Sequence, residues 1–358
     1  MPRVIGVVGT AKNTGKTTTI LHLLRQGHIK NIPIALVGIG YDGEDIDNVT
    51  RLPKPRIFME KGMFVATSEK CLELSTAELR VISRTGFMTP LGEVVTAKIE
   101  DPGLVVVSGP NQAVGLRGVI EEFSSTGVAL ILIDGSINRI IPLMEADVLV
   151  FATGASRNSD ISKLTHEMKA IHEIFRLPEA PAEARLMKDA NTISILSLNG
   201  EIQSIPITSI YDSQDIELLN QALRKESRYV YIPGIVSLGA LKILASEFSS
   251  RIASKAFIFP NAGHILAEGH PCDFAQLIPL LESLEIEIRI LRSVPLAAVT
   301  INPFYARWSP QETKYISCAV NKKELERTMS AILPIPVFNI KEGASDRRLF
   351  ELLTTSLC

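Results

Sequence analysis

A glycine-rich loop near the N-terminus constrains the fold of this chain more than any other feature. Residues Gly9–Thr17 read GTAKNTGKT and directly follow the apolar run Val4–Val8, and an amphipathic stretch begins at Thr17. A loop that wraps around phosphates needs glycines that let backbone N–H groups point inward, a lysine for the terminal phosphates and a hydroxyl for Mg²⁺. Gly9, Gly15, Lys16 and Thr17 supply these groups.

The spacing of this loop departs from the strict pattern G-x-x-x-x-G-K-[ST], which would place a glycine at Thr10 rather than at Gly9. The order of strand, loop and helix is nevertheless the context that supports phosphate binding. A glycine-rich turn with a chance GKT is the alternative interpretation. We therefore expect a nucleotide to be bound by eight residues: Gly9, Thr10, Asn13, Thr14, Gly15, Lys16, Thr17 and Thr18.

The first half of the chain has the pattern of an α/β domain. The runs at 34–40, 104–109, 129–135 and 147–154 are apolar at successive positions, as strands of a helix-covered parallel sheet are. Residues from about 56 to 100 instead contain short alternating runs and a TPLG turn, which predict a β-rich insertion. The predicted fold is a P-loop NTPase domain with a mainly parallel sheet, spanning residues 1–175 and containing this insertion.

The second half predicts a separate α/β domain. Residues 176–190 contain two prolines, several charges and no strand pattern, which indicates a linker. Beyond the linker, strand-like runs such as TISILSL, RYVYIPG and KYISCAV alternate with helical patterns. We expect residues 191–358 to form a second α/β domain that binds a partner or a substrate.

Two acidic residues are candidates for catalysis and for Mg²⁺ binding. Asp134 ends the apolar run ALILID, where a carboxylate would hold the ion through its water shell, although a turn-capping aspartate has the same pattern. Asp42 is the acid nearest the strand end in YDGEDIDN, and a solvated acidic loop is the alternative there. The predicted catalytic residues are Lys16, Asp134 and Asp42, and the predicted metal ligands are Thr17, Asp134 and Asp42.

Composition excludes several other classes of protein. A formal net charge of -2 provides no positive field for a general nucleic-acid role. No apolar run approaches the ~18 residues of a membrane span. The four cysteines are scattered without close pairing, so we expect a cytoplasmic protein without disulfides.

Other local patterns are less specific. His264, His270 and Cys272 lie close together, but without a second ligand pair they are more typical of a polar loop than of a zinc site. The turn at Pro233–Lys242 is a candidate site for a second substrate, and Arg117 is either an arginine near phosphate or a surface residue of a helix. NKKE at 321–324 does not complete a guanine-reading signature, so ATP is the expected nucleotide.

The loop spacing G-T-x-x-x-x-G-K-T resembles dethiobiotin synthetase and the adapter protein of molybdopterin guanine dinucleotide synthesis. Both belong to the SIMIBI class of P-loop proteins, and this resemblance implies a homodimer. The signature lysine of that class would fall on Ala11, whereas this chain has Lys12 one residue later. The segments VIGVVGTAKNTGKTTT, IGYDGED and LIDGSINR also resemble the reactivase subunit of lysine 5,6-aminomutase, an enzyme that uses adenosylcobalamin and pyridoxal phosphate.

These patterns lead to three functional hypotheses. The reactivase resemblance implies an accessory ATPase that removes damaged cobalamin from a partner enzyme, with Lys16 and Thr17 holding MgATP. The synthetase resemblance implies a ligase that uses ATP to phosphorylate a carboxylate or carbamate. A module that binds ATP as a signal without cleaving it is the third hypothesis.

Overall fold

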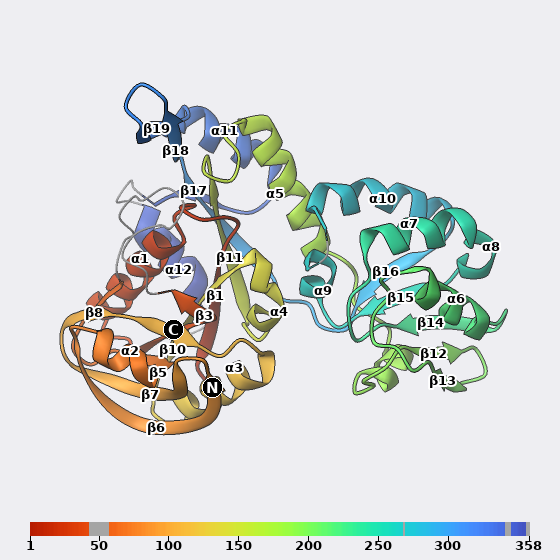
Figure 1. Ribbon diagram of the computed structural model, residues 1–358, viewed down its shortest axis with the longest axis horizontal. Helices are drawn as coiled ribbons and strands as arrows, with labels where there is room; N and C mark the ends of the chain where they lie inside the picture. Colours follow the sequence, from red (N-terminus) through yellow and green to blue (C-terminus); the bar gives the residue numbers. More distant parts are fainter. Residues whose placement is uncertain (43–56, 268, 341–344, 356–358) are drawn as a thin grey trace. The chain divides into compact units, whose positions relative to one another are not determined.

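The computed structural model describes residues 1–42, 57–267, 269–340 and 345–355, and the chain divides into two compact units (Figure 1). Unit 1 contains residues 1–165 and 296–358, and unit 2 contains residues 166–295. The chain therefore enters unit 2 from unit 1 and afterwards returns to it. This division differs from the predicted boundary at residues 176–190.

Unit 1 is built on a mixed sheet that is largely parallel. Nine described strands pair in the order β20-β17-β11-β1-β10-β2-β5-β7-β6. All neighbours from β20 to β5 are parallel, and β7 and β6 continue the sheet in antiparallel fashion. The strands are β1 (Arg3–Gly9), β2 (Ile34–Gly38), β5 (Phe64–Ser68), β6 (Glu78–Thr89), β7 (Gly92–Asp101), β10 (Leu130–Ser136), β11 (Val148–Gly154), β17 (Leu296–Asn302) and β20 (Val337–Asn339).

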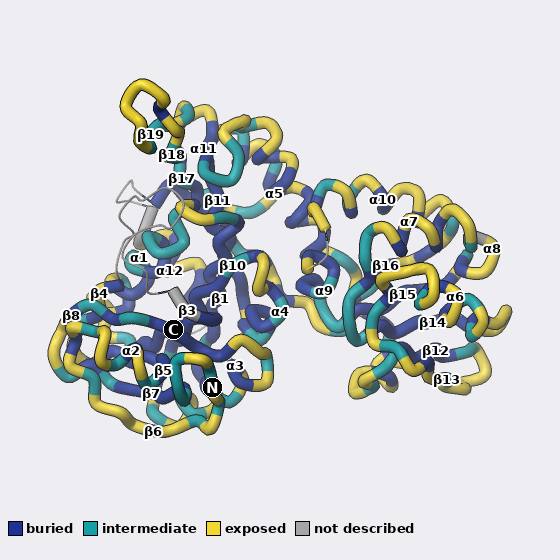
Figure 2. The backbone as a smooth tube through the Cα atoms, viewed as in Figure 1, coloured by how far each residue is buried: buried dark blue, intermediate teal, exposed yellow. Residues whose placement is uncertain are grey.

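Helices cover both faces of this sheet, which explains why its central strands are apolar at successive positions. Residues of α1 (Lys16–Ile29) and α12 (Ser345–Thr354) share one core with Ile5 and Val7 of β1. On the other face, a Cβ on Gly6 would lie 3.2 Å from Leu143 of α4 (Ile140–Leu143). The strands at the centre are buried, whereas the edge strand β6 is exposed along much of its length (Figure 2).

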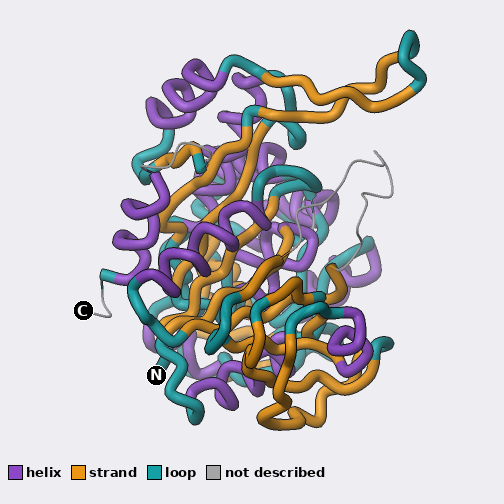
Figure 3. The backbone as a smooth tube through the Cα atoms, turned by 90° about the vertical axis from the view of Figure 1, so that its left-hand side faces the viewer, coloured by secondary structure: helices purple, strands orange, loops and turns teal. Residues whose placement is uncertain are grey.

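The other elements of unit 1 are shorter or lie at the periphery. They are β3 (Gly40–Asp42), β4 (Ile57–Met59), β8 (Gly103–Val105), β9 (Val107–Gly109), α2 (Glu69–Leu74), α3 (Ala113–Ser124), α11 (Lys322–Ile332) and the first residues of α5 (Ile161–Phe175). Strands β18 (Phe304–Ser309) and β19 (Lys314–Ala319) form a two-stranded hairpin that projects from this unit (Figure 3).

The predicted second domain at 191–358 is wrong for residues 296–358. Strand β17 pairs with β11, β20 pairs with β17, and α12 adds Leu349 and Phe350 to the core that contains Ile20 of α1. The pattern of LAAVTIN correctly indicates a strand, but periodicity does not say which sheet a strand joins. The run KYISCAV likewise contributes β19 to unit 1 rather than to a second domain.

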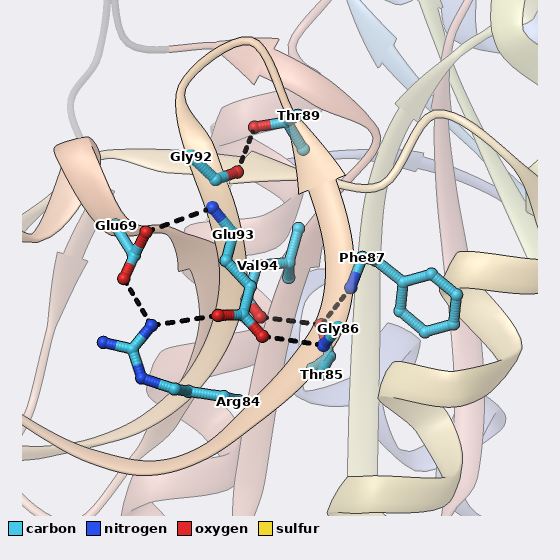
Figure 4. Close-up of polar contacts among 9 residues, drawn as sticks. All are labelled: Glu69, Arg84, Thr85, Gly86, Phe87, Thr89, Gly92, Glu93 and Val94. Carbon is cyan, nitrogen blue, oxygen red and sulfur yellow. Dashed lines mark hydrogen bonds and ion pairs between the residues drawn. The ribbon is translucent and has the colours of Figure 1, made fainter.

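The predicted insertion at about 56–100 is an extension of the main sheet rather than a separate structure. Strand β5 pairs in parallel with β2, and β7 and β6 follow as a long hairpin. Arg84 on β6 forms ion pairs with Glu69 and with Glu93, the latter at 2.9 Å, and Glu93 Oε1 accepts a 2.8 Å hydrogen bond from Gly86 N–H (Figure 4). These contacts fix the tip of the hairpin against α2.

Unit 2 is a smaller α/β unit with a five-stranded sheet in the order β13-β12-β14-β15-β16. Strands β14 (Ser227–Tyr231), β15 (Ala256–Phe259) and β16 (Glu287–Ile290) are parallel, and β12 (Ser194–Ser197) and β13 (Ile202–Ser204) are antiparallel. Its helices are the remainder of α5, α6 (Ser213–Ala222), α7 (Leu238–Glu247), α8 (Ser249–Ile252), α9 (Ala262–Leu266) and α10 (Pro271–Ser283).

The predicted linker at 176–190 is part of unit 2. Glu179 forms a bridge with Ile290 of β16, and a 3-10 helix at Ala182–Met187 places Ala184 and Met187 in the core of this unit. The apolar residues among the charges, rather than the prolines, determine the structure of this segment. No helix in the described part of the chain is long and apolar enough to cross a membrane.

Candidate functional site

The glycine-rich loop lies at the carboxyl edge of the main sheet, near its centre. It connects β1 to α1, and β1 is flanked by β10 and β11, so that Gly9 pairs with Ser136 on one side and Ala152 on the other. Thr10 N–H donates to Ala152 O at 3.0 Å, and the Thr10 hydroxyl donates to Thr153 Oγ1 at 2.9 Å. These bonds anchor the start of the loop to the neighbouring strand.

The conformation of the loop leaves several backbone donors available. Asn13 (φ 62°) and Gly15 (φ 94°) occupy the left-handed region, and the Thr14 hydroxyl donates to Ala11 O at 2.9 Å. Within the described chain, no acceptor is recorded for the N–H groups of Asn13, Thr14 and Gly15. The first turn of α1 contains no acidic residue. N–H groups at a helix N-terminus that lack acceptors form a site for an anion.

Lys16 lies across Gly9 and reaches Asp134 on the next strand. A Cβ on Gly9 would lie 3.3 Å from Lys16 Cδ, so glycine leaves room for the lysine side chain. Lys16 Nζ lies 2.8 Å from Asp134 Oδ1, and the two side chains are 19% and 2% exposed. The structure thus brings together two of the three predicted catalytic residues.

The predicted metal ligands are described to different extents. Thr17 is partly buried in the first turn of α1, close in sequence to the Lys16–Asp134 pair. The backbone of Asp42 ends β3 and pairs with Val107, whereas its side chain and residues Glu44, Asp45 and Asp47 are outside the described part. Asp42 therefore stays a prediction.

The donor set suits a magnesium ion that also has phosphate ligands. Among the described residues, no group of three or more His, Cys, Asp or Glu side chains is arranged to hold a metal ion. Mg²⁺ usually takes one or two protein ligands and completes its shell with water and substrate phosphates. One buried carboxylate and one hydroxyl beside an anion site fit this requirement.

Two residues that sequence reasoning missed support the loop from β17. Asn302 Nδ2 donates to Asn13 O at 2.8 Å, and a Cβ on Gly15 would lie 3.4 Å from Asn302 Cβ. The Thr300 hydroxyl lies 2.9 Å from the Thr19 hydroxyl of α1. The only local signal was a pair of polar residues at the end of an apolar strand, and their distance in sequence from the loop concealed it.

The less specific patterns have structural roles. Arg117 pairs with Glu145 through its Nη2 at 2.9 Å, and Asn321 caps α11 by accepting from Lys323 N–H and Glu324 N–H. His264 Nδ1 lies 3.0 Å from Asn261 Oδ1. His270 caps α10 by accepting from Cys272 N–H at 3.3 Å. Desolvation by burial lowers the pKa of His264 to about 4, which keeps its ring neutral near pH 7.

Comparison with known proteins adds little to this geometry. No model of a known protein family matches the chain, and no curated protein matches it. A solved structure described as pNOB8 ParA bound to nonspecific DNA is similar at 10% identity over 82% of this chain and 88% of that chain, with a TM-score of 0.24. A TM-score this low does not establish a common fold, so the function is argued from the residues of the site itself.

Proposed function

We propose that unit 1 binds a magnesium–nucleoside triphosphate at residues 9–18 and cleaves its terminal phosphoanhydride bond. The observation that carries the proposal is the Lys16–Asp134 ion pair beside a loop whose N–H groups at Asn13, Thr14 and Gly15 have no acceptor among the described residues. These donors suit the phosphate oxygens, and Lys16 suits the charge on the terminal phosphate.

The ion pair is matched to a ligand that carries both a cation and an anion. Transferring Lys16 from Asp134 to a phosphate removes a cation that lies 2.8 Å from a carboxylate only 2% exposed, and removing one member of a buried ion pair is costly. Asp134 would then hold a divalent cation that accompanies the phosphates, and the Thr17 hydroxyl would be the second protein ligand. When bound, the metal would neutralise part of the charge that develops on the phosphates.

The reaction that this arrangement supports is phosphoryl transfer. The bond between the terminal phosphorus and its bridging oxygen breaks, the nucleoside diphosphate leaves, and an acceptor oxygen bonds to the phosphorus. With water as the acceptor, its proton passes to the released phosphate. ATP is the proposed nucleotide, because Asn321 in NKKE is used as a helix cap rather than for reading a base.

The nucleotide site is tested with Lys16→Ala and Lys70→Ala, the second being an exposed lysine of α2 and the matched control. Titration calorimetry would measure the affinity for ATP and GTP with and without Mg²⁺. Loss of charge-assisted hydrogen bonds worth ~1.5–3 kcal/mol predicts roughly 10- to 150-fold weaker MgATP binding by Lys16→Ala only. Wild-type affinity in that variant would refute the proposed site.

We further propose that hydrolysis serves a partner protein, as in an accessory ATPase that matures or reactivates a metabolic enzyme. The support is topological: unit 2 is inserted between β11 and β17, the strands whose ends contact the loop at Thr10 and Asn13. Phosphate release would be measured with and without an adenosylcobalamin-dependent aminomutase, and stimulation by the enzyme is expected. Equal rates with and without it would oppose this role.

An ATP-dependent ligase that phosphorylates a small carboxylate is the second candidate function. The observation that favours it is Arg139, which is linked through the backbone of Ile39 to the strand position that holds Asp134. Strict dependence of ATP cleavage on a small carboxylate, without any partner protein, would support the ligase over the accessory ATPase.

A further inference from the structure

Arg139 follows Asp134 closely in the chain and lies on the β2 side of the nucleotide site. Its Nη1 donates to Ile39 O at 2.8 Å, and Ile39 N–H donates to Asp134 O at 2.8 Å. Since neighbouring strands are ~4.8 Å apart, β10 and the end of β2 bring this guanidinium close to the strand position that holds Asp134. Arg139 thus lies at the same carboxyl edge as Lys16, on the side away from β11 and β17.

A glycine makes room for this guanidinium. Gly40 has φ 73°, and a Cβ on it would lie 1.6 Å from Arg139 Nη1 and 2.9 Å from Asn111 Oδ1. The side chains of Arg139 and Asn111 therefore lie beside each other over Gly40. Any other residue at position 40 would displace the guanidinium and would also be strained in this backbone conformation.

Within the described part of the chain, Arg139 is positioned without an acidic partner. It makes one hydrogen bond there, to the carbonyl of Ile39, and no ion pair. Arg117 provides a contrast, because both its Nε and its Nη2 donate to Glu145. A guanidinium has five N–H donors in a planar fork that fits a carboxylate or a phosphate. Most of the donors of Arg139 are directed to no acceptor of the described chain.

We infer that Arg139 and Asn111 form a second subsite, which binds the carboxylate of a small-molecule substrate next to the terminal phosphate of the nucleotide. This inference rests on the proposed nucleotide site and specifies where the molecule that receives the phosphoryl group binds. Asn111 Nδ2 supplies a further donor, and α3 begins two residues later without a side-chain cap. The subsite holds an oxygen nucleophile in reach of the terminal phosphorus, with the diphosphate as the leaving group.

A guanidinium would also suit the terminal phosphate of the nucleotide itself. The following experiment distinguishes a substrate carboxylate from that phosphate as the ligand of Arg139. Protein saturated with MgADP would be titrated with succinate, a small dicarboxylate, and with inorganic phosphate as a second probe. MgATP and MgADP affinities would be measured in parallel. The variants are Arg139→Ala, Asn111→Ala and the control Arg117→Ala.

We expect wild-type and Arg117→Ala proteins to bind succinate with similar affinity. Arg139→Ala should bind it about tenfold or more weakly, because the paired hydrogen bonds between the guanidinium and the carboxylate are lost. Nucleotide affinities would stay within about twofold of wild type. Loss of MgATP affinity with MgADP affinity unchanged would assign Arg139 to the nucleotide and overturn the acceptor subsite. Succinate binding that is absent in wild type, or unchanged in Arg139→Ala, would also overturn it.

Failure of the proposed nucleotide site is a distinct outcome, because it would appear as absent MgADP binding before any succinate is added. Gly40→Ala provides a second perturbation that leaves the guanidinium in the protein. It is expected to weaken succinate binding as Arg139→Ala does, because its Cβ would occupy the place of Nη1. Amide spectra of each variant would verify that the sheet is intact.

Discussion

Replacing Asn302 by alanine is expected to weaken nucleotide binding, although Asn302 lies at the end of β17, far from the loop in sequence. Asn302 Nδ2 donates to Asn13 O at 2.8 Å, and Asn13 holds the left-handed conformation at φ 62°. A non-glycine residue adopts this conformation only when its surroundings favour it. The substitution removes that support but keeps the backbone bond from Ala155 N–H to Asn302 O.

The size of the effect follows from these two contributions. A neutral hydrogen bond contributes ~0.5–1.5 kcal/mol, and a residue in a sparsely populated backbone region costs ~1–3 kcal/mol unless it is held there. When the bond is lost, the loop populates other conformations, and binding must first restore the competent one. A net cost of about 1–2 kcal/mol corresponds to roughly 5- to 30-fold weaker MgATP binding.

Titration calorimetry with MgATP, together with thermal unfolding, would measure this effect. Asn199→Ala, at an exposed turn of unit 2, is the control. We expect the affinity of Asn302→Ala to fall while its unfolding temperature stays close to that of the control. Unchanged affinity would show that Asn13 holds its conformation without Asn302 and would refute the reasoning.

Three further outcomes test the fold. A fragment that ends before residue 296 is expected to be insoluble, because it exposes the β11 edge and removes part of the core; a soluble, ATP-binding fragment would contradict this. Gly118→Ala should lower the free energy of unfolding by ~1–3 kcal/mol, since its Cβ would lie 2.4 Å from Phe87 Cε2, and Phe87→Ala should remove most of that effect in a double-mutant cycle measured with urea. The pKa of His264 is lowered from 6.5 to about 4 by burial, so the stability gained from its neutral form is present above pH 6.5 and is lost as the pH falls toward 4. Hydrogen exchange of unit 2 should show that its free energy of unfolding falls by about 3 kcal/mol over this pH range in wild type and by much less in His264→Gln. Equal decreases in the two proteins would show that His264 is not the cause.

The elements that could be predicted from the sequence are those whose pattern is local. The loop at Gly9–Thr17 carries its own glycines, lysine and hydroxyl, and the apolar runs on either side determine a strand and a helix. The buried strand that ends near Asp134 could be recognised for the same reason, because a double-sided apolar run indicates a covered sheet. The 2.8 Å contact of Lys16 with Asp134 follows once both strands lie in one sheet.

The elements that could not be predicted depend on pairing between distant segments. LAAVTIN indicates a strand at 296–302, but nothing within it specifies β11 as its neighbour. Asn302 and Thr300 therefore carried no recognisable link to Asn13 and Thr19. Arg139 was overlooked for a related reason, since its significance depends on the space that Gly40 leaves on another strand.

The order of strands divides the carboxyl edge of unit 1 into two sides with different contacts. On one side, β11 and β17 hold the loop through Thr153 and Asn302, and the whole of unit 2 is inserted between these two strands. On the other side, β10 and the end of β2 present Asp134 and Arg139, the groups proposed to bind the metal and the acceptor. The proposed accessory ATPase and the proposed ligase both require Lys16 and Asp134. They differ in a further requirement, because the accessory role depends on the strands that lead into unit 2, whereas the ligase depends on Arg139.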